Sequence, residues 1–346
     1  MRRFICIAAA LGILSTPVVH AESVLRVGFC ARTITSAAAP FAIANKFGWF
    51  GGFRVELVAL AGSVDCVKYV GTGELRYTLP SIEPLGNLRP QGIRAKVFYT
   101  AYQGNIYGIA VPVESPIKTL ADLKGKTIGV PSMASGGTLV ARAIAAELGF
   151  GQEVSIVAIG EGAQAAALVR SNQVNALSFY DTQYAVIENV GVALRMIPDP
   201  DFDRFPSNGL IALEDTLSKN HAEAVALGQG YAKGTIFAIN NPTAAVHIVW
   251  EVFPYTKATG KDEATALVDD VKTLEARIVN WKLDKAGVTR WGESSLDNYQ
   301  AYLDFLLKWQ VLKEPVKAAD VVTNDLIAEI NAFDANAIAA AARSYK

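Results

Sequence analysis

The segment from Ser132 to Thr138 (SMASGGT) stands out in the sequence because it combines small residues with hydroxyl-bearing ones. Small residues let the backbone approach a ligand closely, and Ser or Thr hydroxyls at a helix N-terminus either donate outward or cap the helix. The segment therefore predicts a site for a carboxylate, a sulfonate or a similar anion, with an ordinary N-cap as the alternative. Gly62-Ser63 is a weaker instance of the same pattern. The ligand-binding residues expected from the two segments are Gly62, Ser63, Ser132, Ser135, Gly136, Gly137 and Thr138.

Charged and aromatic residues occupy similar positions, just after predicted strands. Arg32, Glu83 and Asp181 would give a cleft one cation and two carboxylates. That set suits a ligand with amino or ring N–H donors and an acceptor, while surface charges are the alternative. Tyrosines in such positions are suited to stack on a planar ligand, or else are half-buried aromatics of an interface. The residues expected to bind ligand here are Arg32, Ser81, Glu83, Tyr102, Tyr180 and Asp181, with Tyr107 beside them.

Several classes of chemistry are disfavoured by the composition. The 32 Lys and Arg against 33 Asp and Glu leave no basic excess for binding nucleic acid. Only three His and three Cys are present, and a Cys/His zinc site needs about four ligands at short spacing. No G-x-S-x-G elbow, phosphate loop or dinucleotide fingerprint occurs, and His221 and His247 lie in a tail far from the predicted cleft. We expect no catalytic residue, no metal and no cofactor.

The N-terminus has the pattern of a secretory signal peptide. Arg2 and Arg3 precede an uncharged run over residues 4–14, and Val19-His20-Ala21 ends the segment with a small residue. A buried helix or a membrane anchor is the alternative, although the run is too short to span a bilayer. We expect cleavage after Ala21 and a periplasmic location, where Cys30 and Cys66 form either one disulfide or two separate thiols.

The elements that must position these residues alternate between strand and helix twice over. Such alternation implies βαβ units and parallel sheets, and ligands bind beyond the carboxyl ends of the strands. The predicted strands are 24–30, 53–60, 76–80, 127–130, 154–159, 174–180 and 209–213, and the predicted helices among them are 36–49, 63–72, 137–148 and 163–173. Beyond Leu217 the chain is helical by period and by composition.

Two α/β lobes follow, each a mostly parallel sheet flanked by helices. We expect residues 1–21 to be the signal peptide, 22–108 and 208–346 the first lobe, and 109–207 the second lobe. Crossovers near residues 107–113 and 205–209 would form a hinge between them, and the helical tail would pack back on the first lobe.

The chain resembles the periplasmic solute-binding proteins of ABC importers, in the group that binds sulfonate, nitrate or the thiamine pyrimidine precursor. The resemblance covers most of the mature chain, and its most specific segment is LADLKGKTIGV at 120–130. Further segments that carry it are LRVG at 25–28, AIANKFGWF at 42–50, VELV at 55–58, Gly62-Ser63, GEL at 73–75, and YLDFLLKWQVLKEP at 302–315 with Thr323-Asn324. It implies a two-lobed periplasmic-binding-protein fold of type II, with ligand contacts at 62–63, 81–83, 132–138 and 180–181. Cys30-Ala31-Arg32 and Arg76-Tyr77-Thr78 depart from the family pattern.

The resemblance implies a monomer that binds a small solute without catalysis and delivers it to a membrane permease. Glu83 and Asp181 are expected on opposite lobes, so closure would need a donor or a positive charge between them. We therefore expect an aminopyrimidine-like solute, with sulfonate or nitrate as the alternative. A secreted enzyme of the same fold, related to pyrimidine-precursor synthases, is the hypothesis from another class, and a periplasmic sensor or scaffold domain is a third.

Overall fold

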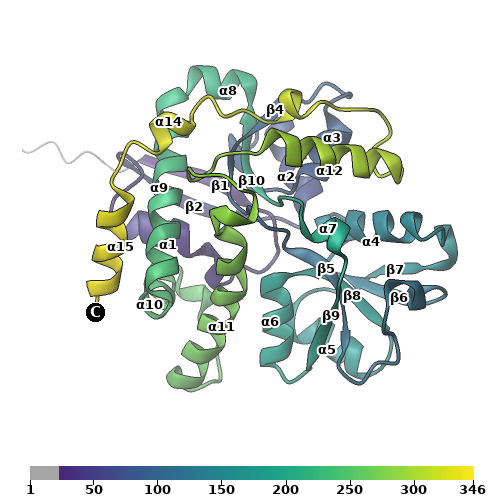
Figure 1. Ribbon diagram of the computed structural model, residues 1–346. Helices are drawn as coiled ribbons and strands as arrows, with labels where there is room; N and C mark the ends of the chain where they lie inside the picture. Colours follow the sequence, from purple (N-terminus) through teal and green to yellow (C-terminus); the bar gives the residue numbers. More distant parts are fainter. Residues whose placement is uncertain (1–22) are drawn as a thin grey trace, which may run out of the picture.

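The computed structural model describes residues 23–346, and the expected signal peptide lies outside this range (Figure 1). Ten strands within that range form two sheets of five. The first sheet has the order β2-β1-β3-β10-β4, and the second has the order β7-β6-β8-β5-β9. The strands of the first sheet are β1 (Ser23–Phe29), β2 (Phe53–Ala59), β3 (Tyr77–Thr78), β4 (Ala95–Thr100) and β10 (Gly209–Leu213). Those of the second are β5 (Tyr107–Pro112), β6 (Thr127–Val130), β7 (Ser155–Ala158), β8 (Ala176–Tyr180) and β9 (Leu194–Ile197).

Four of the five strands in each sheet run in the same direction, as expected for the predicted mostly parallel sheets, and one strand differs in direction. β1 pairs in parallel with β2 and β3, and β6 pairs in parallel with β7 and β8. β10 is antiparallel to β3 and β4, and β5 is antiparallel to β8 and β9. The strands at the two crossings between sheets cause the difference, because each enters its sheet against the direction of the βαβ units.

Helices flank both sheets. Those that follow strands of the first sheet are α1 (Ala39–Lys46), α2 (Ser63–Gly71) and α3 (Ile82–Leu88). Those of the second are α4 (Gly136–Glu147), α5 (Gly162–Arg170), α6 (Asp181–Asn189) and the short α7 (Pro200–Asp203). The tail contains α8 (Glu214–Lys219), α9 (His221–Asn240), α10 (Pro242–Val252), α11 (Glu263–Trp281), α12 (Leu296–Lys308), α13 (Ala318–Val321), α14 (Ile327–Ile330) and α15 (Ala335–Ser344). Short 3₁₀ turns lie at Ser36–Ala38, Leu120–Leu123, Gly151–Glu153, Pro254–Thr256 and Leu283–Lys285. Within residues 23–346, no helix has the length and apolar character needed to cross a membrane.

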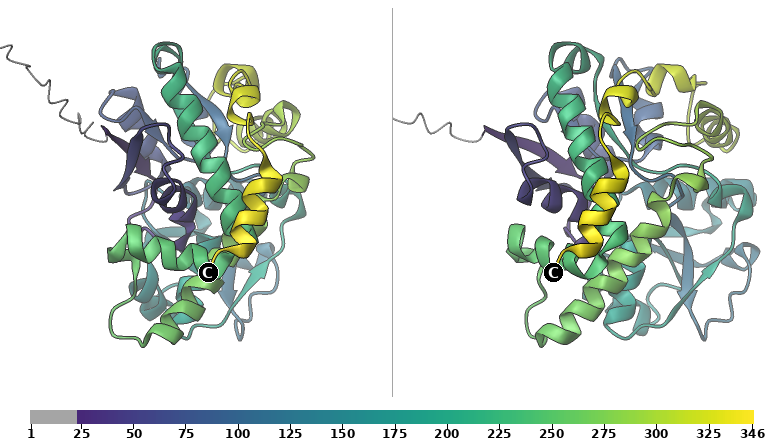
Figure 2. Two further views of the ribbon diagram at one scale, coloured as in Figure 1. Left: turned by 90° about the vertical axis from the view of Figure 1, so that its left-hand side faces the viewer. Right: turned by 60° about the vertical axis from the view of Figure 1, so that its left-hand side comes forward.

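The helical tail packs back on the first lobe, with one exception. α9 lies along α1, and Gly234 makes this possible because a Cβ there would lie 2.2 Å from the Pro40 carbonyl oxygen. α15 in turn lies along α9 (Figure 2). The exception is α11, which extends from α10 onto α6 of the second lobe (Figure 1). The tail therefore joins the two lobes as well as covering the first.

The chain passes between the sheets through two crossing segments, residues 101–106 and 198–208. They are hydrogen-bonded to each other: Ala101 N and Tyr102 N both donate to Asn208 O at 3.0 Å, and Ser207 N donates to Tyr102 O at 3.0 Å. The two crossings therefore lie side by side at the junction of the lobes.

A disulfide joins Cys30 and Cys66, with a Cα–Cα distance of 5.9 Å. Cys30 directly follows β1, and Cys66 is a fully buried residue of α2. Of the two alternatives that the sequence left open, the structure contains the bonded one. The disulfide fixes the start of the loop after β1 against the first lobe.

We expect this disulfide to stabilise the first lobe, because it spans 36 residues of sequence. Constraining a loop of that length in the unfolded chain contributes about 3–4 kcal/mol. A chain that begins at Glu22 and carries Cys30→Ala and Cys66→Ala should have a free energy of unfolding in urea lower by about that amount. Equal stability of this variant and the parent, or two free thiols in the denatured, non-reduced parent, would contradict the assignment.

Candidate functional site

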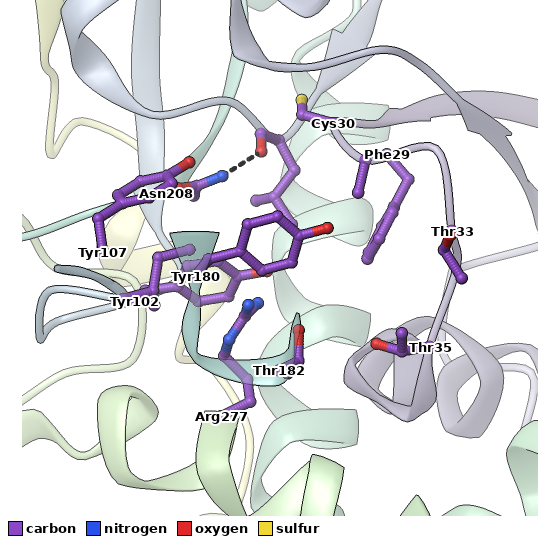
Figure 3. Close-up of a pocket in the computed structure, with 13 residues that line it drawn as sticks. Phe29, Cys30, Thr33, Thr35, Tyr102, Tyr107, Tyr180, Thr182, Asn208 and Arg277 are labelled. Carbon is purple, nitrogen blue, oxygen red and sulfur yellow. Dashed lines mark hydrogen bonds between the residues drawn. The ribbon is translucent and has the colours of Figure 1, made fainter. Parts of the chain in front are cut away.

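A small cavity lies between the lobes at the crossing segments (Figure 3). Its walls come from the loop after β1, from both crossing segments, from the end of β8 and from α6 and α11. The lining residues are Phe29, Cys30, Ala31, Thr33, Thr35, Leu79, Tyr102, Ile106, Tyr107, Tyr180, Thr182, Asn208 and Arg277. Residues of both lobes thus enclose one small space.

Aromatic rings form much of the wall. Phe29 faces the cavity from the first lobe, and three tyrosines face it from the crossing segment, β5 and β8. The rings of Tyr107 and Tyr180 meet edge to face at 6.4 Å. Burial raises the pKa of Tyr102, Tyr107 and Tyr180, so their hydroxyls stay protonated. Flat walls of this kind favour a flat solute.

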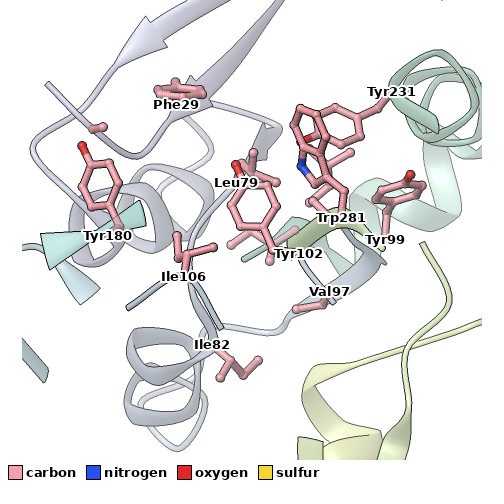
Figure 4. Packing of buried hydrophobic residues seen from close by; sticks show 14 of the residues in the cluster. Phe29, Leu79, Ile82, Val97, Tyr99, Tyr102, Ile106, Tyr180, Tyr231 and Trp281 are labelled. Atoms are coloured by element: carbon pink, nitrogen blue, oxygen red, sulfur yellow. The ribbon is translucent and has the colours of Figure 1, made fainter. Parts of the chain in front are cut away.

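The aromatic wall is continuous with the hydrophobic core of the first lobe. Behind Tyr102 the core extends to Trp281, Tyr231 and Tyr99 (Figure 4). The rings of Tyr99 and Tyr231 pack edge to face at 5.5 Å. Tyr102 is 2% exposed and is therefore held in place by packing.

The hydroxyl and amide groups of the cavity are positioned by local hydrogen bonds. Thr35 caps the following 3₁₀ turn, its Oγ1 accepting from Ala37 N at 3.3 Å. Asn208 Nδ2 donates to Leu79 O at 2.8 Å, and its Oδ1 accepts from Ser207 Oγ at 3.0 Å. Thr33 and Thr182 add hydroxyls from opposite lobes. A solute in this space meets neutral donors and acceptors on several sides.

Arg277 brings the cavity its one cationic side chain among the described residues that line it. Its Nε donates to Asp181 Oδ2 at 2.8 Å, and its Nη2 donates to Asp181 Oδ1 at 2.6 Å. Burial lowers the pKa of Arg277, but the Asp181 carboxylate together with Tyr102 and Tyr231 opposes burial, and the net result is a raised pKa. The guanidinium also lies over the Tyr102 ring, 4.1 Å from its centroid. The positive charge is therefore balanced inside the protein.

Only part of the predicted ligand set reaches this cavity. Tyr102 and Tyr180 line it. Arg32 and Ser132 line a separate, more open groove between the tips of the lobes. Asp181 is occupied by Arg277, and Asn280 Nδ2 also donates to it at 3.0 Å. The prediction of Asp181 as a free carboxylate for a ligand is therefore corrected, because its charge is neutralised by a residue from the tail.

The hydroxyls of Ser132, Ser135 and Thr138 form hydrogen bonds within the protein. Ser135 is the N-cap of α4, its Oγ accepting from Gly137 N at 3.2 Å. Thr138 Oγ1 donates to Ser132 O at 2.8 Å. A Cβ at Gly136 would lie 2.5 Å from the Tyr107 hydroxyl, and one at Gly137 would lie 2.3 Å from a backbone oxygen, which leaves neither residue open to a ligand. At Ser135 the segment therefore forms an ordinary helix N-cap, which is the alternative that the sequence left open.

Gly62 lies at the contact between the lobes, and Ser63 forms its hydrogen bond within the first lobe. Ser132 Oγ donates to Ala61 O at 2.6 Å, and Val64 N donates to Ala134 O at 3.1 Å. A Cβ on Gly62 would lie 2.4 Å from the same Ala134 oxygen, so glycine permits this close approach. Ser63 Oγ accepts from Ser81 N at 3.1 Å. Gly62 and Ser132 therefore help to hold the lobe tips together.

Glu83 lies at the start of α3, 1% exposed and away from the cavity lining. Tyr302 donates its hydroxyl to Glu83 Oε1. Burial raises the pKa of Glu83, although hydrogen bonds from Ser81 and Tyr302 oppose the shift. The prediction that Glu83 and Asp181 bring two charged carboxylates to the ligand is corrected, because one is paired with Arg277 and the other lies inside the first lobe.

Several site residues were outside the predicted set. Thr33 and Thr35 lie in the loop after β1, where the sequence placed a candidate segment without selecting these two residues. Glu161, before α5, accepts from Thr33 N at 2.9 Å and from the Tyr180 hydroxyl at 3.0 Å, and so links the lobes at the mouth. Arg277 comes from a tail helix, and no local pattern places it near the cleft. Among the described residues, no group of three or more His, Cys, Asp or Glu is placed to hold a metal.

The fold and the cavity define a two-lobed periplasmic-binding-protein fold, and solved structures share it. A protein from Bordetella bronchiseptica is 21% identical, with 90% of this chain and 97% of that chain covered and a TM-score of 0.68. The alkanesulfonate-binding protein of Xanthomonas axonopodis, bound to MOPS, is 16% identical, with coverage of 88% and 99% and a TM-score of 0.65. The periplasmic nitrate-binding protein of Synechocystis is 16% identical, with coverage of 89% and 88% and a TM-score of 0.63.

The NMT1/THI5-like family model matches residues 35–245, which is more than half of the chain. The chain therefore belongs to the NMT1/THI5-like family. This confirms the family and the two-lobed fold that the sequence resemblance implied. No curated protein sequence gives a significant match to the chain.

Glu83 should make a contribution to the folding stability of the protein that is lost as the pH rises. Because its pKa is raised in the folded state, its contribution is complete below the ordinary carboxyl value of 4.5 and is lost as the pH rises through the raised value. The stability of Glu83→Gln relative to the wild type should therefore increase from pH 4 to pH 8. Urea unfolding at both pH values measures this difference, with the exposed Glu114→Gln as the control. A difference that stays constant with pH would contradict a buried neutral carboxyl.

Ser135→Ala should act on helix stability and leave the cavity unchanged. Loss of an N-cap hydroxyl costs about 1 kcal/mol of unfolding free energy. Urea unfolding and solute titration of this variant separate the two roles. A loss of solute affinity with unchanged stability would restore the segment to the ligand site.

Proposed function

We propose that the protein is the solute-binding component of an ABC import system. It captures a small solute in the interlobe cavity, in the periplasm, and presents the closed form to a membrane permease. The observation that carries the proposal is the cavity itself, which is enclosed by residues of both lobes beside the crossing segments. The family match and the fold shared with sulfonate- and nitrate-binding proteins support it.

The cavity favours a flat, uncharged solute such as an aminopyrimidine. Aromatic rings line it, and hydroxyl and amide groups supply hydrogen bonds. The Arg277 charge is already balanced by Asp181, so an anion would enter a space without a free counter-charge. Sulfonate or nitrate is the second candidate, because proteins with similar structures bind them. Asp181 is paired with Arg277 and Glu83 lies outside the cavity lining, so two unpaired carboxylates do not select for amino groups on the solute.

Solute capture would proceed by closure of the lobes about the crossing segments. The hydrogen bond at the mouth from Thr33 N to Glu161 joins the two lobes, so it exists only when the lobes meet. A solute that touches both lobes favours the closed state, because it gains its full set of contacts only there. Binding without turnover distinguishes this function from a secreted enzyme of the same fold.

A thermal-shift screen followed by calorimetry tests the proposal. We expect one solute among cytosine, related aminopyrimidines, aromatic acids, alkylsulfonates, nitrate and amines to bind the mature chain at one site. At 100 times its Kd it should stabilise the protein by about 2.7 kcal/mol. The solute should be recovered unchanged after long incubation. Chemical conversion of the solute would favour the enzyme hypothesis instead.

Tyr180→Ala should weaken that solute about tenfold or more, which corresponds to about 1.4 kcal/mol. The reason is loss of an aromatic wall contributed by the second lobe. Tyr255→Ala is the matched control, since Tyr255 is 64% exposed and lies away from the cavity. Equal affinity of the two variants, measured by calorimetry, would remove the solute from this cavity.

A further inference from the structure

The Arg277–Asp181 ion pair joins two elements of different lobes. Asp181 begins α6, directly after β8 of the second sheet. Arg277 lies on α11, a helix of the tail that packs on α10 of the first lobe. The side chains are 3% and 11% exposed, so the pair is buried at the junction. No other ion pair that links the two lobes, among the described residues, is buried to this degree.

Only one edge of the guanidinium is used in this pair. Nε and Nη2 hold the two carboxylate oxygens of Asp181. Nη1 takes no part in the pair with Asp181, and Arg277 lines the cavity (Figure 3). Arg277 therefore faces Asp181 on one side and the space for a solute on the other.

We propose that Arg277 couples solute recognition to lobe closure: its Nε edge locks Asp181 of the second lobe, and its Nη1 edge donates to an acceptor atom of the solute. The contact of Nη1 with the solute rests on the proposed function, while the ion pair that locks the lobes together does not. The acceptor would be a carbonyl oxygen or a ring nitrogen, and a solute that lacks one would be discriminated against. Tyr102 keeps the guanidinium in this orientation by lying against its face.

The physical basis is the cost of an uncompensated buried charge. Removing one partner leaves the other charged and buried, and separation of the lobes would let water reach it. Replacing both partners by apolar residues of similar size leaves no charge to solvate, so closure is retained. The single variant should therefore open and the double variant should stay closed like the wild type, which a role in local packing alone would not produce.

The first measurement is small-angle X-ray scattering of the solute-free full-length mature chain. Asp181→Asn should increase the radius of gyration over the wild type, and Arg277→Met with Asp181→Leu should return it to the wild-type value. The matched control is Lys272→Met, because Lys272 and Glu188 form a second α11–α6 pair whose side chains are 51% and 30% exposed. This control should leave the radius unchanged. An unchanged radius in Asp181→Asn, or a double variant as expanded as the single, would overturn the lock.

The second measurement is calorimetry with cytosine, an aminopyrimidine that carries a carbonyl acceptor. The compact double variant should bind cytosine at least tenfold more weakly than the wild type and the Lys272→Met control, because the cavity-facing donor is gone. Wild-type affinity in the double variant would overturn recognition by Arg277. If the wild type binds no cytosine, recognition of this probe is overturned as well. The scattering result decides the lock separately, so its failure is distinguishable from failure of the proposed function.

Discussion

The structure depends on the way in which the chain passes between its two sheets. Both crossings lie side by side and are hydrogen-bonded through Tyr102 and Asn208. Because β5 and β10 enter their sheets antiparallel to their neighbours, the crossings are anchored by strands on both sides. The same residues that connect the lobes therefore form part of the cavity between them, and a solute bound there contacts the junction directly.

The junction between the lobes also contains a buried ion pair. α11 supplies Arg277 from the tail, and α6 supplies Asp181 from the second lobe. The pair removes a net charge from the cavity wall, so aromatic rings and neutral polar groups determine what fits. Affinity and closure then depend on one set of contacts, since the tail helix that completes the first lobe also reaches the second.

The sequence predicted the fold better than the site, for physical reasons. β6 and β10 have the predicted bounds, because short β-branched and apolar runs with clear breakers identify buried strands. β4, β5 and β9 were missed as strands. Tyr102 and Tyr180 were predicted from their places after strands. Ser135 was misassigned because a capping hydroxyl and a ligand-binding hydroxyl have the same local pattern. Arg277 reaches the cavity only through tertiary packing of a distant helix.

The most direct test of the central claim is a crystal structure of the mature chain with the solute that the binding screen identifies. The account predicts that the solute lies between Phe29, Tyr102 and Tyr180, with contacts from both lobes and the crossing segments. A solute bound instead in the open groove at Arg32 and Ser132, or contacting one lobe alone, would contradict it.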